Sequence, residues 1–182
     1  MARIRSNSQL VLRPQDLLVL LRLALQQDSP PSYAALGAEL GLTASETHAA
    51  VERAVAAQLA HKGVDGKPSV IKEALLLFVL HGARYCFPAV RGEITRGLPT
   101  VYAADPLKSL VVVPNNEPPP VWPHKHGTQR GMTLYPLYPS VPEAALRNPA
   151  LYELLVLFDA VRAGSARERA LAIPMLEARL QP

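Results

Sequence analysis

Residues 32–59 read SYAALGAELGLTASETHAAVERAVAAQL, and this stretch decides the fold of the N-terminal part of the chain. It predicts two helices joined by a tight turn, because apolar residues recur at helical spacing on both sides of Gly41. Glycine suits the bend because it tolerates a positive φ. Thr43 and Glu46 have the T-x-x-E spacing of a capping box, which would begin the second helix, expected over about residues 44–61. The stretch therefore predicts a helix-turn-helix, in which the second helix is presented to the major groove of DNA.

The same residues carry a resemblance to a known family. The pattern Leu36-Gly37-x-x-Leu40-Gly41-Leu42-Thr43-x-Ser45-Glu46-x-His48-x-Ala50-Val51 is similar to the LA-x-x-LG-L-S-x-S-E-V-H-x-A-V pattern of bacterial winged helix-turn-helix regulators, broadly MarR-like or GntR-like. Gly37 stands where alanine is usual and Thr47 where valine or isoleucine is usual, and both fit the required small or β-branched volumes. The resemblance covers about 30 of the 182 residues and implies a DNA-binding domain in the N-terminal part only.

The composition is that of a globular protein, because 49% of the residues are hydrophobic. The apolar runs at residues 17–25 and 74–80 are much shorter than a membrane span, and the first lacks a signal-peptide cleavage pattern. We therefore expect a cytoplasmic, nucleoid-associated protein with no membrane partner. The single cysteine, Cys86, excludes an internal disulfide and is expected to be a buried structural thiol. The net charge of +4 arises within residues 67–135 and is modest for a DNA-binding protein.

An apolar helix is expected before the helix-turn-helix. Pro14 suits its first turn, and residues 17–25 are apolar on nearly every side. Such a helix belongs at the centre of the core or in an interface with a second subunit. Ser32 can cap the helix that follows, and residues 62–68 predict a turn before a further helix at about residues 69–81.

The middle of the chain predicts strands. Residues 84–88 and 98–103 are expected to be short strands, and residues 90–97 between them a basic β-hairpin that would serve as the wing. Proline is frequent over residues 104–120, around a short apolar strand at residues 110–113. This composition predicts an extended, semi-rigid passage after the wing.

The C-terminal part is expected to combine a β element with helices. Residues 121–134 predict a second hairpin, and residues 149–162 and 167–180 predict two helices. The expected fold class is therefore α+β. A winged helix-turn-helix domain would cover residues 9–104, and residues 105–182 would hold the proline-rich β element and the helical pair, used for interaction or dimerisation.

The sequence shows no catalytic or metal site. His124 and His126 would lie on one face of a strand, but no third ligand is near them, so we expect a basic loop rather than a metal site. The sequence has no phosphate-binding glycine loop, H-E-x-x-H motif or nucleophile elbow, and its carboxylates form no recognisable acid–base pair. We therefore expect no enzymatic activity and no cofactor.

The outward face of the predicted second helix offers few groups that read DNA bases. Arg53 is its one guanidinium and could pair with guanine O6 and N7, while an alanine such as Ala49 could touch a thymine methyl group. Arg91 and Arg96 in the predicted wing, with Lys62, would contact phosphates or the minor groove. The complete set of predicted DNA-binding residues is Thr43, Ser45, Glu46, His48, Ala49, Arg53, Lys62, Arg91 and Arg96.

The favoured function is sequence-specific binding of double-stranded DNA by a bacterial transcriptional regulator. A homodimer is expected, because a single module with few base-reading side chains would bind poorly. The apolar first helix and the helix at residues 149–162 are the candidate dimer elements. The alternative is a protein-interaction role, as an antitoxin or an adaptor subunit. In that case the segment after residue 105 would bind a partner protein encoded nearby, and the winged helix would regulate its own operon.

Overall fold

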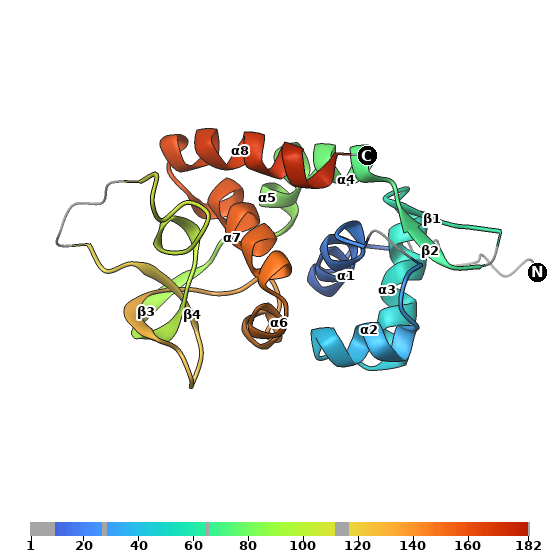
Figure 1. Ribbon diagram of the computed structural model, residues 1–182, viewed down its shortest axis with the longest axis horizontal. Coiled ribbons are helices and arrows are strands. Elements are labelled where there is room, and N and C mark those ends of the chain that lie inside the picture. The colour runs from blue at the N-terminus through green and yellow to red at the C-terminus, as the bar shows by residue number, and fades with distance from the viewer. Residues whose placement is uncertain (1–9, 27–28, 65, 112–116, 182) are drawn as a thin grey trace, which may run out of the picture.

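The computed structural model describes residues 10–26, 29–64, 66–111 and 117–181. These residues form an α+β fold, as predicted, with helices along most of its length and two small sheets. Figure 1 shows that the N-terminal helices and a β-hairpin form one end of the long axis, and that the second sheet forms the other end. No helix within these ranges has the length and apolarity that crossing a membrane requires.

The first helix of the fold is a core element. The fold opens with α1 (Pro14–Ala24), α2 (Tyr33–Leu40) and α3 (Ala44–Ala56). Pro14 occupies the first turn of α1, as predicted, where its missing N–H costs no hydrogen bond. α1 contacts α3 and also α7 (Pro149–Ala163), so residues 17–21 are fully buried inside one chain. The apolar surface expected to serve a second subunit is therefore covered by the chain itself.

The predicted junction between α2 and α3 is confirmed. Ser32 Oγ accepts a hydrogen bond from the Ala35 N–H at 3.2 Å, which caps α2. Gly41 ends that helix with a φ of 69°, in the left-handed region that favours glycine. At the start of α3, Thr43 Oγ1 accepts from the Glu46 N–H at 3.1 Å, and Glu46 Oε2 accepts from the Thr43 N–H at 2.8 Å. These two hydrogen bonds form the predicted capping box.

A β-hairpin follows α3 directly, where only a turn was predicted. α3 ends at Ala56 rather than near residue 61, because Gln58 adopts a positive φ of 59° and breaks the helical run. β1 (Ala60–Lys62) then pairs antiparallel with β2 (Pro68–Val70). The predicted turn at residues 62–68 is the tip of this hairpin.

A bent helical segment connects the hairpin to the second sheet. α4 (Lys72–Leu77) continues through a π-helical turn at Phe78–Gly82 into α5 (Ala83–Cys86). The helix predicted at residues 69–81 therefore begins three residues later, after β2, and its helical path extends to residue 86.

The strand predicted at residues 84–88 is wrong, because its first residues complete the bent helix. Phe78 and Phe87 pack edge to face, with ring centroids 6.3 Å apart. This contact holds the two ends of the turn close together, which favours a helical path over an extended one. Cys86 is exposed at the end of α5, so the prediction of a buried thiol is also wrong.

The hairpin predicted at residues 90–97 is wrong, because β3 (Arg91–Pro99) is one continuous strand. It pairs antiparallel with β5 (Gln129–Leu134) along most of its length and with β4 (Pro120–Pro123) at its end. The glycines of β3 allow the backbone of a neighbouring strand to approach closely, and they do not form a turn. A Cβ atom on Gly97 would lie only 2.0 Å from a carbonyl oxygen of β4.

The second predicted hairpin, at residues 121–134, is also wrong. Because β4 and β5 both run antiparallel to β3, they are parallel to each other, and the three strands close into a small barrel. Residues 101–103 form a short 3-10 helix where a strand was predicted. The strand predicted at residues 110–113 lies partly outside the described residues, and Leu110 lies in a turn. Pairing of β3 with β4 and β5 crosses the boundary predicted at residue 104.

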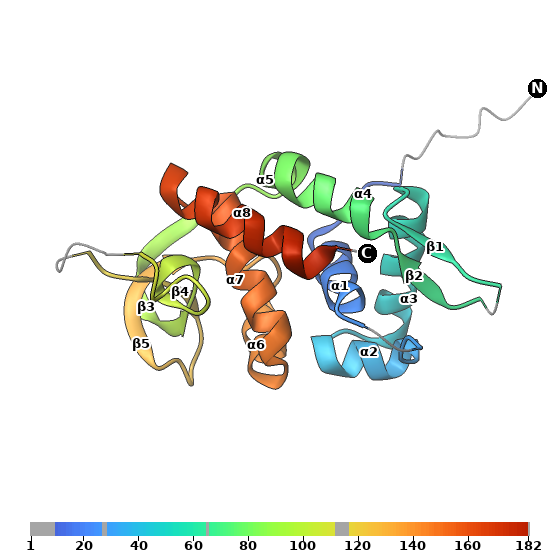
Figure 2. The same cartoon turned by 45° about the horizontal axis from the view of Figure 1, so that its top comes forward.

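Three helices end the fold: α6 (Val141–Arg147), α7 and α8 (Ala166–Leu180). The helices predicted at residues 149–162 and 167–180 are confirmed, whereas α6 was not predicted. α7 is buried along most of its length, so this second candidate dimer element also belongs to the core of one chain. Figure 2 shows α8 lying along α4, where Lys72 Nζ donates to the Gln181 carbonyl oxygen at 3.0 Å.

A buried polar cluster holds α7 against the barrel. Asp159 is 1% exposed, and its carboxylate accepts hydrogen bonds from Trp122 Nε1 at 2.6 Å and Thr100 Oγ1 at 3.0 Å. Arg162 Nη2 donates to the second carboxylate oxygen at 2.8 Å. The buried charge is therefore both paired and hydrogen-bonded, which is the condition under which a core tolerates a carboxylate.

Candidate nucleic-acid interface

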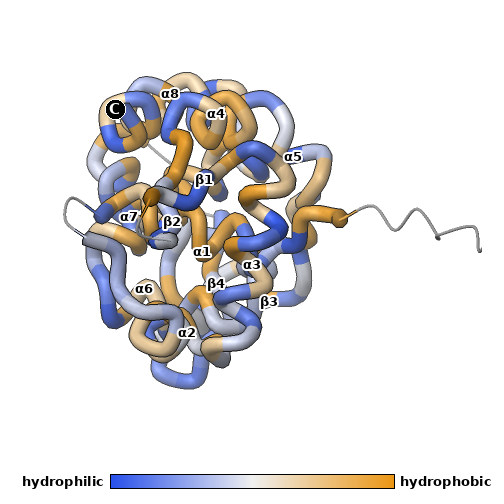
Figure 3. Tube along the Cα trace, turned by 90° about the vertical axis from the view of Figure 1, so that its right-hand side faces the viewer, coloured by the Kyte–Doolittle hydropathy of each residue, from blue (hydrophilic) through white to orange (hydrophobic). Residues whose placement is uncertain are grey.

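α3 and the β1–β2 hairpin share one end of the molecule. Figure 3 views this end, with α2, α3 and both strands of the hairpin on the facing side. The buried positions of α3 are Thr47, Ala50, Val51 and Ala54, which recur at helical spacing. Its opposite face is accessible and consists of Ser45, His48, Ala49, Glu52 and Ala56. The helix therefore presents a continuous outer face made of small or polar side chains.

The first turn of α3 is held by its cap. The Glu46 carboxylate accepts from the Thr43 N–H at 2.8 Å and from Thr43 Oγ1 at 2.8 Å. Both hydrogen bonds stabilise the ionised form and lower the pKa of Glu46. Ser45 is exposed beside this cap. Thr43 and Glu46 therefore set the geometry of the helix start, and Ser45 is the group of this turn that faces outward.

The central part of the outer face is a small charge network that includes the hairpin. His48 Nε2 lies 3.5 Å from Glu52 Oε1, and Lys62 Nζ of β1 contacts the same carboxylate oxygen. The hydrogen bond from Lys62 lowers the pKa of Glu52, and in return the pKa of Lys62 is raised. The His48 ring also packs edge to face on Tyr33 of α2, with ring centroids 5.1 Å apart. Glu52 thus offsets the positive charge that Lys62 brings to this face.

Arg53 does not face outward, which contradicts its predicted role as the base-reading guanidinium. Its Nε and Nη2 atoms donate to the two carboxylate oxygens of Asp16 in α1, at 2.7 and 2.6 Å. The Arg53 side chain is 12% exposed and that of Asp16 is fully buried. The hydrogen bond to Asp16 raises the pKa of Arg53. The buried Asp16 carboxylate needs a cationic partner, and Arg53 of α3 provides it. The guanidinium of Arg53 is therefore not available on the outer face of α3.

Arg91 and Arg96 lie on β3, at the opposite end of the molecule from α3 (Figure 1). They cannot flank α3 as the predicted wing required. Arg91 Nη2 donates to the Ala163 carbonyl oxygen at 3.0 Å, and Arg96 lies opposite Arg130 of β5. The element that does flank α3 is the β1–β2 hairpin, whose exposed lysines are Lys62 and Lys67.

Sequence reasoning missed Lys67 and the hairpin, although a signal was present. Gly63 and Gly66 stand between two three-residue strands, and glycines between short strands are typical of a hairpin tip. Gly66 adopts a positive φ of 74°. Lys67 Nζ donates to Ser29 Oγ at 2.5 Å, which ties the base of the tip to the segment before α2. These strands were too short to stand out from the end of the preceding helix.

His124, the first residue of the histidine pair, contacts α6. His124 Nε2 lies 2.9 Å from Glu143 Oε1, so it joins the β4–β5 connection to α6. The His124 and His126 rings lie 5.7 Å apart. Among the residues that the structure describes, no three histidine, cysteine or acidic side chains form a group that could hold a metal ion.

Comparison of the chain with models of protein families, with curated proteins and with solved structures gave no match.

Proposed function

We propose that this protein binds double-stranded DNA through α3 and the β1–β2 hairpin, as a bacterial transcriptional regulator of the winged helix-turn-helix type. The observation that carries the proposal is the order α1–α2–α3–β1–β2, with the outer face of α3 exposed next to the hairpin. In such an arrangement the second helix of the pair enters the major groove and the hairpin lies along the phosphate backbone. This is also the arrangement that the resemblance over residues 36–51 implies.

In the proposed complex, the first half of α3 faces the bases. Ser45 and His48 would donate or accept hydrogen bonds, and Ala49 would contact a thymine methyl group. Lys62 and Lys67 on the hairpin would contact phosphates, which position the protein without reading sequence. With Arg53 turned inward, one copy offers few base contacts. We therefore propose that two copies bind together, so that each contributes one half-site.

One observation favours a second candidate function, in which the same face binds a partner protein. The His48–Glu52–Lys62 network leaves the outer face of α3 close to neutral. A DNA-binding surface is usually strongly positive because phosphate neutralisation supplies most of the affinity. In this alternative the protein is an adaptor or an antitoxin, and its contact with DNA is secondary.

The test is fluorescence anisotropy of the full chain with a labelled duplex selected from a random-sequence pool. Lys62→Ala/Lys67→Ala should weaken binding and make the slope of log K against log salt shallower by about 2, since each phosphate contact contributes about 0.9. Ala49→Glu, which places a carboxylate on the outer face of α3, should abolish binding. The matched control is Arg96→Ala/Arg130→Ala, which removes two cations from the far end of the molecule and should leave affinity and slope unchanged.

Equal losses in the two double variants would contradict the proposed interface. If no duplex is enriched by the selection, while a protein is retained by the wild type and lost with Ala49→Glu, the second candidate function is supported instead. The solution mass tests the dimer, which should be twice the 19.7 kDa of one chain.

A further inference from the structure

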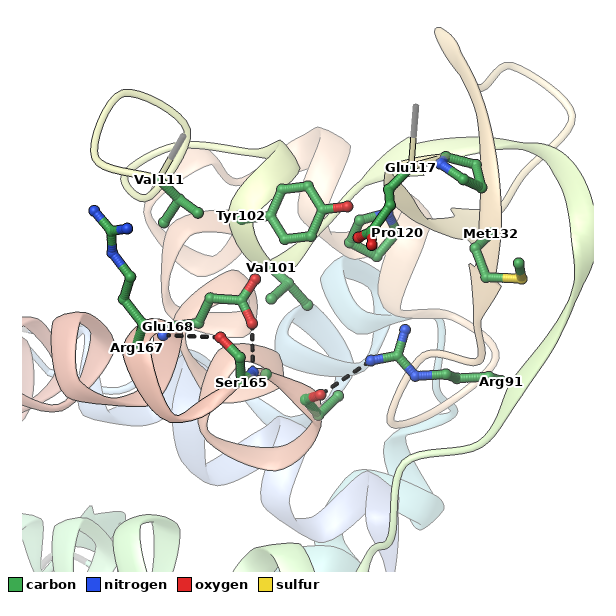
Figure 4. Close-up of a pocket in the computed structure, with 13 residues that line it drawn as sticks. Arg91, Val101, Tyr102, Val111, Glu117, Pro120, Met132, Ser165, Arg167 and Glu168 are labelled. Atoms are coloured by element: carbon green, nitrogen blue, oxygen red, sulfur yellow. Dashed lines mark hydrogen bonds between the residues drawn. The ribbon is translucent and has the colours of Figure 1, made fainter. Parts of the chain in front are cut away.

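A cleft of about 660 Å³ lies at the other half of the molecule, between the barrel and the junction of α7 with α8. Figure 4 shows its walls. β3 contributes Arg91, β5 contributes Met132, and the 3-10 turn after β3 contributes Val101 and Tyr102. Glu168, in the first turn of α8, closes the cleft on the helical side. The cleft has no role in the proposed DNA interface.

Arg91 is an exposed residue at one side of the cleft. Its Nη2 atom donates to the Ala163 carbonyl oxygen at 3.0 Å, at the end of α7. This contact anchors the planar guanidinium from one side. Within the described ranges, the other N–H groups of Arg91 make no hydrogen bond, so they can receive a ligand. A guanidinium held in this way is suited to a carboxylate, which it can bind through two parallel hydrogen bonds.

Glu168 presents a carboxylate on the helical side of the cleft. Its Oε2 atom accepts from the Ser165 N–H at 2.5 Å as part of the cap of α8, and the residue is only 7% exposed. Figure 4 shows this carboxylate facing Val101 and Tyr102, inside the cleft. Oε1 has no hydrogen bond to any residue that the structure describes. One oxygen therefore holds the helix, and the other is available to a donor on a ligand.

Tyr102 lies between the charged groups. Burial, followed by the negative charges of Glu117 and Glu168, raises the pKa of its hydroxyl, while Arg91 acts in the opposite direction. These influences show that two carboxylates and a guanidinium all act on the space around one aromatic ring. Cationic and anionic side chains are balanced along the walls, since Arg91 and Arg167 match Glu117 and Glu168.

The turn that carries Tyr102 is strained. Val101 has a φ of 52°, a value that β-branched residues very rarely adopt, and its side chain is 3% exposed. Strain of this kind persists only where the surroundings fix it, and it gathers at binding sites. Here the strained residue is Val101, which directly precedes Tyr102 in the cleft wall.

We propose that this cleft binds a small zwitterion with an apolar side chain, such as a free amino acid. Its carboxylate would pair with Arg91, and its ammonium group with Glu168. Its apolar side chain would lie against Val101, Tyr102 and Met132. A small-molecule site usually combines apolar side chains with a few polar groups that orient the ligand. Opposite charges on facing walls select a ligand that carries both charges over one that carries either alone.

The experiment is isothermal titration calorimetry of the full chain with L-phenylalanine and L-leucine. Two half-molecules serve as matched ligands: 3-phenylpropanoate lacks the ammonium group, and 2-phenylethylamine lacks the carboxylate. We expect one site per chain for at least one of the two amino acids. With L-phenylalanine the affinity should be at least tenfold higher than with either half-molecule. Because these comparisons use the unaltered protein, they do not depend on whether a variant folds.

Two variants assign the charges. Glu168→Gln keeps an acceptor for the Ser165 N–H, and should weaken amino-acid binding at least tenfold while leaving 3-phenylpropanoate unaffected. Arg91→Gln should weaken amino-acid binding to a similar degree and leave 2-phenylethylamine unaffected. Arg130→Gln, on the barrel outside the cleft, is the control and should bind as the wild type does.

The proposal is overturned if neither amino acid gives saturable heat, or if 3-phenylpropanoate binds as tightly as L-phenylalanine. Unchanged amino-acid affinity in Glu168→Gln and Arg91→Gln would overturn it as well. None of these readouts involves DNA, so their failure would leave the proposed DNA binding untouched.

Discussion

Replacing Arg53 by methionine should destabilise the whole N-terminal end without changing how the protein selects DNA. The substitution keeps the aliphatic stem of the side chain and removes its two hydrogen bonds, of 2.7 and 2.6 Å, to Asp16. The Asp16 carboxylate is fully buried and would keep only the Arg13 N–H, at 2.8 Å, as a partner. An uncompensated charge would therefore remain between α1 and α3.

The expected loss is about 3–5 kcal/mol, the usual result of removing one partner from a buried ion pair. For a chain of this length, each kcal/mol lowers the melting temperature by about 2–4 °C, so the transition should fall by roughly 6–20 °C. Asp16→Leu/Arg53→Met removes both charges. Its cost should be smaller than that of Arg53→Met, because only the hydrogen bond to the Arg13 N–H is lost, worth about 0.5–2 kcal/mol at a helix start.

Urea unfolding followed by circular dichroism measures the four free energies of unfolding needed for a double-mutant cycle. The assignment of Arg53 and Asp16 as a desolvated ion pair would be contradicted by either of two results. One is a decrease of less than about 1 kcal/mol in the free energy of unfolding of Arg53→Met, and the other is a double variant that is less stable than Arg53→Met. DNA selection by Arg53→Met well below its melting temperature supplies a second test. If Arg53→Met reduced the difference in affinity between selected and random duplexes, Arg53 would have to contact the bases.

Three further substitutions test other parts of the fold. Trp122→Phe should cost about 1–3 kcal/mol in urea unfolding, because the buried Asp159 loses its 2.6 Å hydrogen bond; an unchanged midpoint would refute the cluster. Gly41→Ala should lower the melting temperature, since a φ of 69° strains any side chain, and a neutral result would place this turn elsewhere. Burial alone would raise the pKa of Glu39, but the hydrogen bond from Arg22 outweighs burial, and the pKa in the folded state is lowered. Ionised Glu39 therefore stabilises the folded state fully above its unfolded pKa of about 4.3, and this contribution is lost as the pH falls through the lower folded pKa. The stability gap between wild type and Glu39→Gln should therefore narrow below that pH, and a gap that widens would contradict the pairing.

Short-range signals in the sequence were sufficient to predict the junction between α2 and α3. The cap at Ser32, the turn at Gly41 and the capping box of Thr43 with Glu46 each involve residues within a few positions of one another. Their chemistry is local, so it can be identified without knowledge of the rest of the chain. The helices α1, α7 and α8 were also predicted, because apolar residues recur at helical spacing along each of them.

Long-range pairing explains what the sequence did not show. Arg53 lies 37 residues from Asp16, and helical periodicity alone placed its side chain on the outer face. The course of β3 depends on β4 and β5, which follow more than 20 residues later, so residues 90–97 were predicted to form a hairpin of their own. The position of α3 was therefore predicted correctly, whereas the hairpin beside it was expected at residues 90–97 and lies at residues 60–70. The cleft could not be predicted, since its lining residues are spread along the sequence from Arg91 to Glu168.

The enclosure of α1 has a consequence for how the chain is made. α3 covers one flank of this apolar helix soon after it is synthesised, but the other flank is covered by α7, which is translated more than a hundred residues later. During most of translation the nascent chain therefore carries a partly uncovered run of leucines, a surface that chaperones bind and that favours aggregation. The N-terminal and C-terminal parts of the chain are thus coupled in time as well as in space, because α1 reaches its final packing only after α7 has left the ribosome.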